Sequence, residues 1–193
     1  MKYLGVFIDS NLSWKIHVDH LPNKISKSIG ILSKMRYYTN IDILVRLYYA
    51  LIYPFLIYAL TAWGNTYSTT LGPLVVLQKK KAVRIITFSQ LDEHSSPLFR
   101  HLQIIKLVDL VELFTGTFMC KPNLLPFNFS DLFTPVNQVH SYNTRLASKL
   151  SFSLPKTRTN YGIFNIPFQG ANVWNSLNDA IKKLPGIIDP IQI

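Results

Sequence analysis

Hydrophobic residues recur at helical spacing over about the first 120 positions of the chain, and lysines fall between them. A spacing of three to four residues predicts amphipathic helices that bury one face. The first helix is kinked or restarted by Pro22. The second is capped by the side chain of Asn40 and ends at Gly64. Helices are predicted to begin at these positions: Ser13, Asn40, Pro73, Ser96 and Lys106.

The two ends of the chain follow other patterns. A β-branched and aromatic run from Tyr3 to Ile8 predicts one short strand, which needs a partner for its backbone groups. Beyond residue 121, prolines alternate with Phe and Asn, which predicts irregular chain with a short helix around Val173 to Lys183. We therefore predict a mainly α fold: a helical bundle with one N-terminal edge strand and an irregular, Pro-rich C-terminal segment. The predicted domains are residues 1-12, a strand remnant; 13-120, a helical domain; and 121-193, the C-terminal extension.

The excess of positive charge favours polyanionic partners. The chain has 20 Lys and Arg against 10 Asp and Glu, a net charge of +10, which attracts polyanions such as nucleic acid or an anionic membrane surface. A hydrophobic share of 48% excludes wholesale disorder. The single cysteine, Cys120, excludes an internal disulfide framework and favours a reducing compartment. The first residues lack the pattern of a signal peptide, so we expect an intracellular protein.

Two of the predicted helices carry basic surfaces. In the third helix Lys80, Lys81 and Arg84 fall on one side, and a hydrophobic stripe that includes Leu74 and Ala82 falls on the other. A helix of this kind can pack on a core while its outer face meets phosphates. The predicted nucleic-acid-binding residues are Lys24, Lys27, Lys34, Arg36, Lys79, Lys80, Lys81 and Arg84.

No set of residues in the sequence predicts a catalytic centre. Two-metal polymerase or nuclease chemistry needs paired carboxylates, whereas Asp9 stands alone and the adjacent Asp92 and Glu93 point apart in a loop. His17 and His20 share a helical face but lack an identifiable third ligand. We predict no catalytic residue and no metal site in this chain.

One hydrophobic stretch allows a second interpretation. Leu47 to Trp63 is nearly all apolar, at the lower limit of the length that spans a bilayer. A central helix buried on all sides by protein has the same composition. The sequence alone leaves both interpretations open.

Several short motifs follow one another along nearly the whole chain, and their order is specific. They are Tyr3–Asp9, Leu12–Trp14 with His17, Lys24–Ile25, Gly30–Leu32, Leu47–Pro54 with Tyr58, Trp63–Gly64, Gln78–Arg84, His140–Arg145 and Gly170–Asn175. This order resembles the segment that follows the catalytic hairpin in reverse transcriptases of non-LTR (LINE-type) retrotransposons. The last two motifs are similar to tail motifs of jockey- and CR1-like elements.

The resemblance implies a role for each segment. Tyr3, Leu4 and Gly5 correspond to the primer grip, and the helices that follow correspond to the thumb, which holds the template–primer duplex through backbone contacts. The fingers and the catalytic palm would lie upstream of Met1, in a longer element or gene. The resemblance therefore implies a fragment of an RNA-directed DNA polymerase that is inactive alone.

The same resemblance implies partners and a location. The expected partners are an RNA/DNA template–primer duplex and an upstream polypeptide with palm and fingers, with no membrane. Mg²⁺ would belong to the palm, so no cofactor is expected here. The expected location is the cytoplasm or nucleus. The alternatives are a single-span membrane protein through Leu47–Trp63 and a non-functional transposon remnant.

Overall fold

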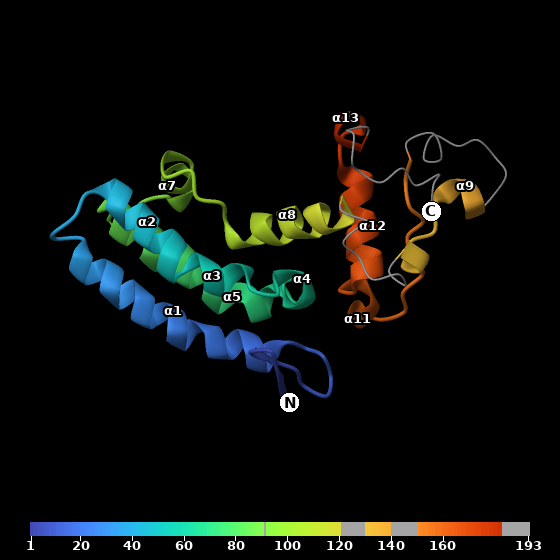
Figure 1. Ribbon diagram of the computed structural model, residues 1–193, viewed down its shortest axis with the longest axis horizontal. Helices are drawn as coiled ribbons and strands as arrows, with labels where there is room; N and C mark the ends of the chain where they lie inside the picture. The colour runs from blue at the N-terminus through green and yellow to red at the C-terminus, as the bar shows by residue number, and fades with distance from the viewer. Residues whose placement is uncertain (91, 121–129, 140–149, 183–193) are drawn as a thin grey trace. The chain divides into compact units, whose positions relative to one another are not determined.

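The protein consists of two compact units (Figure 1). The computed structural model describes residues 1–90, 92–120, 130–139 and 150–182. The units are Met1–Val111 and Glu112–Ile193, and the division between them falls inside helix α8 (Leu107–Met119). The boundary predicted near residue 121 lies after this division because both units use the same continuous helix. The predicted mainly α fold class is confirmed.

A small antiparallel hairpin begins the first unit. Strands β1 (Lys2–Tyr3) and β2 (Val6–Phe7) pair with Tyr3 opposite Val6. Leu4 and Gly5 have φ angles of 44° and 85°, in the left-handed region that turns the chain sharply. The structure thus corrects the prediction of one strand, because this turn folds the run back on itself.

Helices make up the rest of the first unit, and α1 packs beside α2 and α5 (Figure 1). The helices are α1 (Lys15–Met35), α2 (Ile41–Leu51), α3 (Tyr53–Ile57), α4 (Leu60–Trp63), α5 (Ser68–Val76), the π-helical segment η1 (Leu77–Ala82), α6 (Val83–Thr87) and α7 (Ser95–His101), followed by the start of α8. The largest fully buried side chains of this unit include Tyr48, Ile52, Leu56, Leu60, Trp63 and Leu74.

Only some of the helices begin where the sequence predicted. The Asn40 cap is confirmed, because its Oδ1 accepts a hydrogen bond of 3.0 Å from the Ile43 N–H. Ser13 does not cap the first helix as predicted. Its hydroxyl donates to the Asp9 carboxylate, and α1 begins after Trp14, which has a φ of 61°. Pro22 lies inside α1, which continues through it.

The apolar stretch Leu47–Trp63 is divided among α2, α3 and α4. Pro54 stands in the first turn of α3, where its lack of an N–H is tolerated, and Ala59, with a φ of 53°, separates α3 from α4. The structure therefore corrects the prediction of one helix from Asn40 to Gly64. Over the described part of the chain, no helix combines the length and the hydrophobicity needed to cross a bilayer.

Helices α5, η1 and α6 follow one another directly, and the π-helical segment in the middle changes which residues are buried. A π turn bonds residue i to residue i+5, so it widens the helix and shifts the phase of everything after it. As a result three consecutive residues, Ala82, Val83 and Arg84, are buried. Pro73 lies within α5 and not in its first turn as predicted.

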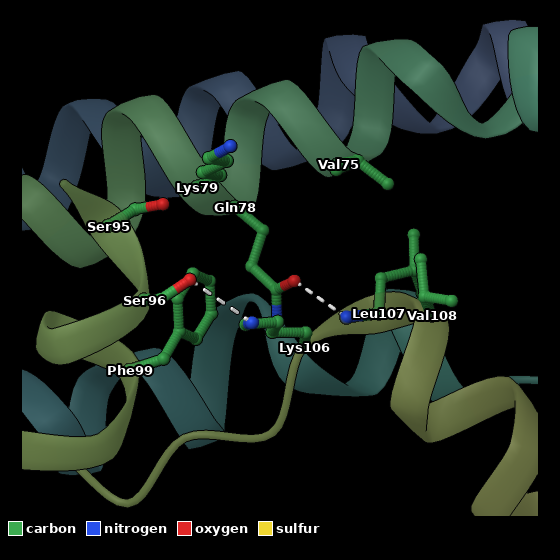
Figure 2. A pocket seen from close by; sticks show the side chains of 9 residues that line it. All are labelled: Val75, Gln78, Lys79, Ser95, Ser96, Phe99, Lys106, Leu107 and Val108. Carbon is green, nitrogen blue, oxygen red and sulfur yellow. Dashed lines mark hydrogen bonds between the residues drawn. The ribbon is translucent and has the colours of Figure 1, made fainter.

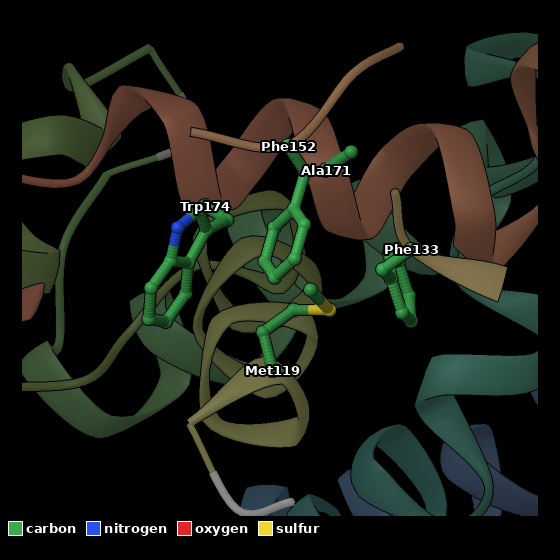
Figure 3. Close-up of a cluster of buried hydrophobic side chains, with 5 residues drawn as sticks. All are labelled: Met119, Phe133, Phe152, Ala171 and Trp174. Atoms are coloured by element: carbon green, nitrogen blue, oxygen red, sulfur yellow. The ribbon is translucent and has the colours of Figure 1, made fainter. Parts of the chain in front are cut away.

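The second unit is built around a small aromatic core (Figure 3). Met119, Phe133, Phe152, Ala171 and Trp174 are buried together, with Phe152 between the rings of Phe133 and Trp174 at centroid distances of 5.6 and 5.7 Å. The described elements after α8 are η3 (Ser130–Leu132), α9 (Val136–Val139), α11 (Asn160–Ile163), α12 (Ile166–Ser176) and α13 (Asp179–Lys182). This segment is thus more regular than predicted, because the core fixes several short helices.

The motif Gly170–Asn175 supplies much of this core. A Cβ at Gly170 would lie 2.7 Å from the Met119 sulfur, so glycine allows α12 to approach α8 closely. The side-chain amide of Asn175 accepts a hydrogen bond from the Phe152 N–H and donates one to the Phe152 carbonyl, each 2.9 Å long. The indole of Trp174 donates to the Leu150 carbonyl over 2.8 Å. The motif His140–Arg145 lies outside the described residues.

Candidate nucleic-acid interface

The π-helical segment presents three consecutive lysines to solvent. Lys79, Lys80 and Lys81 are all exposed, while Leu77, Gln78 and Ala82 on the same segment are buried. None of these lysines forms an ion pair within the described part of the chain. Their charges are therefore available to an external anion.

Arg84 does not belong to this surface, contrary to the sequence prediction. Its side chain is only 8% exposed, and its Nη2 donates a 2.6 Å hydrogen bond to the Glu93 carbonyl. Its Nε is buried and has no hydrogen-bond partner among the described residues. The phase shift of η1 turns Arg84 inward, where it holds the segment that leads to α7.

Helix α1 carries the second basic surface. Lys24, Lys27 and Lys34 are exposed, and none of them is paired with a described carboxylate. The Lys24 ammonium lies 5.8 Å from the centre of the Phe55 ring, a cation–π distance. Because α1 also packs against α5 and η1, both basic segments belong to one packed helical unit.

Arg36 lies at the end of α1 in an aromatic setting. Its guanidinium lies 4.4 Å from the centre of the Phe88 ring, so this half-buried residue is committed in part to a cation–π contact. The next two residues, Tyr37 and Tyr38, are 78% and 84% exposed at the turn between α1 and α2. Aromatic rings of this kind can stack on bases. The sequence predictions did not include them, although two adjacent tyrosines before the Asn40 cap were a visible signal.

The Gln78 side chain joins three parts of the first unit. Its Nε2 donates to the Tyr48 hydroxyl at 2.8 Å and to the Ile105 carbonyl at 2.9 Å. Its Oε1 accepts from the Leu107 N–H at 2.8 Å, which satisfies a free donor at the start of α8. Burial raises the pKa of Tyr48, so its hydroxyl stays protonated. Figure 2 shows the Gln78 amide reaching toward Leu107 beside a pocket.

The primer-grip-like residues Tyr3, Leu4 and Gly5 are exposed in the hairpin. The Tyr58 hydroxyl donates to the Leu4 carbonyl, and a Cβ at Gly5 would lie 3.8 Å from the Tyr58 ring. This contact ties the hairpin turn to the end of α3. It gives Tyr58, a residue of one of the predicted family motifs, a structural role.

The candidate metal ligand His17 is instead part of the packing under the hairpin. Its Nδ1 accepts a 3.4 Å hydrogen bond from the Phe7 N–H, and its ring lies 5.6 Å from that of Trp63. Burial, together with the nearby charges of His20 and Lys24, lowers the pKa of His17. Within the described residues, no group of three or more His, Cys, Asp or Glu side chains is placed to hold a metal ion.

The candidate acids remain separate from one another. Both carboxylate oxygens of Asp9 bond to Ser13, one to its N–H and one to its hydroxyl. Asp92 and Glu93 are exposed between α6 and α7. Comparison of the chain with protein-family models, curated proteins and solved structures finds no match. The basic surfaces and the order of motifs are therefore the features that indicate a function.

Proposed function

We propose that this chain is the thumb and post-thumb part of a non-LTR retrotransposon reverse transcriptase, and that it binds the template–primer duplex. The observation that carries the proposal is the pairing of two basic helical surfaces in one unit. Lys24, Lys27 and Lys34 on α1, together with Lys79–Lys81 on η1, are exposed without carboxylate partners in the described part of the chain. Helices α1 and η1 pack directly against each other.

The lysines of this surface bind nucleic acid through phosphates and not through bases. Lysine ammonium groups neutralise phosphates and release counterions, so binding is tolerant of sequence and sensitive to salt. Lysine is a flexible point charge and does not read base edges in a fixed geometry. The proposed ligand is therefore an RNA–DNA or RNA–RNA duplex of any sequence.

The rest of the proposal follows the resemblance. The palm and fingers, on an upstream polypeptide, would supply the catalytic carboxylates and their Mg²⁺. This chain would contribute no cofactor and no polymerase activity of its own. The chain would be located in the cytoplasm or the nucleus, where it would bind the template. Purified chain is then expected to extend no primer with either Mg²⁺ or Mn²⁺.

The test removes charge from η1 without touching its buried face. In a Lys80→Gln/Lys81→Gln variant, each lost phosphate contact should flatten the slope of log affinity against log salt by about 0.7 to 0.9, or roughly 1.5 in total. Fluorescence anisotropy with a labelled RNA–DNA duplex over a salt series measures both affinity and slope. Gln is a good helix former, so circular dichroism should be unchanged.

A Lys156→Gln/Arg158→Gln variant is the matched control. Both residues are exposed and lie in the second unit, and the loss of net charge is the same. It should bind like the wild type. If the two variants lose affinity equally, the duplex is attracted by net charge and not by this surface, and the proposal fails. An unchanged slope in the η1 variant would also contradict it.

A further inference from the structure

A pocket of about 150 Å³ lies beside the Gln78 side chain, between η1, α7 and the start of α8 (Figure 2). Its polar lining includes Lys79, Ser95, Ser96 and Lys106, and its apolar walls include Val75 and Phe99. None of its lining residues is acidic. Two cations and two hydroxyls therefore meet in a small space with no carboxylate among them.

The backbone on both sides of Lys106 is fixed. The Gln78 amide binds the Ile105 carbonyl and the Leu107 N–H, so residues before and after Lys106 are held by one buried side chain. The Lys106 ammonium donates a 3.4 Å hydrogen bond to the Ser96 hydroxyl and lies 6.0 Å from the centre of the Phe99 ring. The cation is thus positioned at the pocket before any ligand arrives, which reduces the entropy lost on binding.

Ser95 adds a hydroxyl donor to the wall of the pocket. The residue is only 3% exposed, and its hydroxyl forms no hydrogen bond to another described residue, although it is not one of the fully buried polar atoms that lack a partner. Figure 2 shows this hydroxyl pointing into the pocket. An oxygen of a bound anion would complete its hydrogen bonding.

We propose that this pocket binds a single phosphate group. The Lys79 and Lys106 ammonium groups and the Ser95 and Ser96 hydroxyls offer donors to several oxygens of one tetrahedral anion. The site shares the exposed Lys79 with the basic surface of η1, and it differs from that surface because Lys106 and the two serines add donors from other segments. The inference does not rest on duplex binding. The phosphate is either part of a nucleic acid, a backbone or terminal group, or a free phosphate ion.

The first experiment titrates the full chain with inorganic phosphate at constant ionic strength, with chloride as the balancing anion so that screening stays fixed. Saturable shifts in the amide resonances of residues that line the pocket are expected. Losing one charged donor in Lys106→Met should weaken phosphate binding by about tenfold or more. Lys80→Met is the matched control, because this exposed neighbour does not line the pocket, and its affinity should equal that of the wild type.

A second variant covers the case in which Lys106→Met disturbs the fold. Ser95→Ala removes the unpartnered hydroxyl, keeps every charge and changes little volume, and it should weaken phosphate binding by several-fold. Circular dichroism checks both variants. The proposal is overturned if phosphate does not saturate, or if Lys106→Met and Ser95→Ala bind phosphate as well as the wild type. Equal weakening in Lys80→Met would likewise overturn it, because attraction would then be diffuse.

Competition separates the two sources of phosphate. If the pocket holds a phosphate of nucleic acid, inorganic phosphate should compete with the labelled duplex, and Lys106→Met should weaken both ligands. If it holds a free phosphate ion, the variant should lose phosphate alone and keep its duplex affinity. Either outcome supports the proposal that the pocket binds a phosphate group. A Lys80→Gln/Lys81→Gln variant that loses the duplex but keeps phosphate shows that the two proposals stand or fail separately.

Discussion

Each of the two units uses one side-chain amide on a helix to hold a distant backbone segment, but the two amides stand in different surroundings. In the first unit the buried Gln78 binds Tyr48, Ile105 and Leu107. In the second unit the half-buried Asn175 binds both backbone groups of Phe152. Gln78 has exposed lysines directly beside it, whereas Asn175 follows the buried Trp174.

The difference shows how motifs should be interpreted. Both amides belong to motifs from which the sequence predicted a likeness to reverse transcriptases. In the motif Gln78–Arg84 the first and last residues serve the fold, and the three lysines between them are free to bind. In the motif Gly170–Asn175 the glycine, the tryptophan and the asparagine all serve packing or backbone pairing. A sequence motif can therefore serve packing as readily as ligand contact.

The strongest test of this comparison removes each amide in turn. Gln78→Met keeps the shape but leaves two buried partners and one partly buried partner unsatisfied, so we expect a loss of roughly 3–5 kcal/mol in the free energy of unfolding. Asn175→Leu should cost roughly 1–2 kcal/mol, because the surrounding groups are closer to water. Urea denaturation gives the totals, and hydrogen exchange assigns each loss to a unit. If both variants lost the same free energy of unfolding, the two amides would not differ in importance. Gln90→Met, at an exposed position, is the neutral control.

Glycines in the two units should respond in opposite directions. Gly170→Ala places a methyl group against Met119 and Phe133 in the second core, so we expect a loss of roughly 1–3 kcal/mol. At Gly30, inside α1, an added methyl group would meet no heavy atom within 4 Å, and Gly30→Ala should stabilise the first unit by roughly 0.5–1 kcal/mol. Thermal and urea unfolding measure both changes. A neutral Gly170→Ala would mean that the flexible Met119 yields without strain.

The smallest expected effect concerns pH and is confined to the first unit. The pKa of His17 is lowered in the folded protein, first by burial and then by the charges of His20 and Lys24. Below its ordinary pKa of about 6.5, the unfolded chain takes up a proton that the folded chain resists. Stability should therefore fall as the pH drops below that value, with the unfolded state binding more protons. At higher pH the effect disappears.

Variants of two histidines test this assignment. The slope of stability against pH below neutrality should be flatter in His17→Gln, which keeps a hydrogen-bond acceptor for the Phe7 N–H. His101→Gln, at an exposed position, should keep the wild-type slope. Melting temperatures over a pH series provide the slopes. A wild-type slope in His17→Gln would assign the effect to another group.

The chain's local patterns determined the mainly α fold, the Asn40 cap, the approximate positions of the later helices and the exposure of Lys24, Lys27, Lys34 and Lys79–Lys81. Each depends on interactions within a few residues, so periodicity and capping chemistry suffice to predict them. The basic surfaces were therefore visible in the sequence. Their ligand remains a proposal.

Only the tertiary structure decided where Arg84 points and what surrounds Ser95 and Lys106. A sequence pattern assumes a uniform helical repeat, whereas the π-helical segment η1 widens one turn and rotates all that follows it. The pocket is formed by segments far apart in the chain, which Gln78 brings together through hydrogen bonds to Ile105 and Leu107. No local sequence pattern specifies this contact between distant segments, because it depends on which helix faces pack against each other in the tertiary structure.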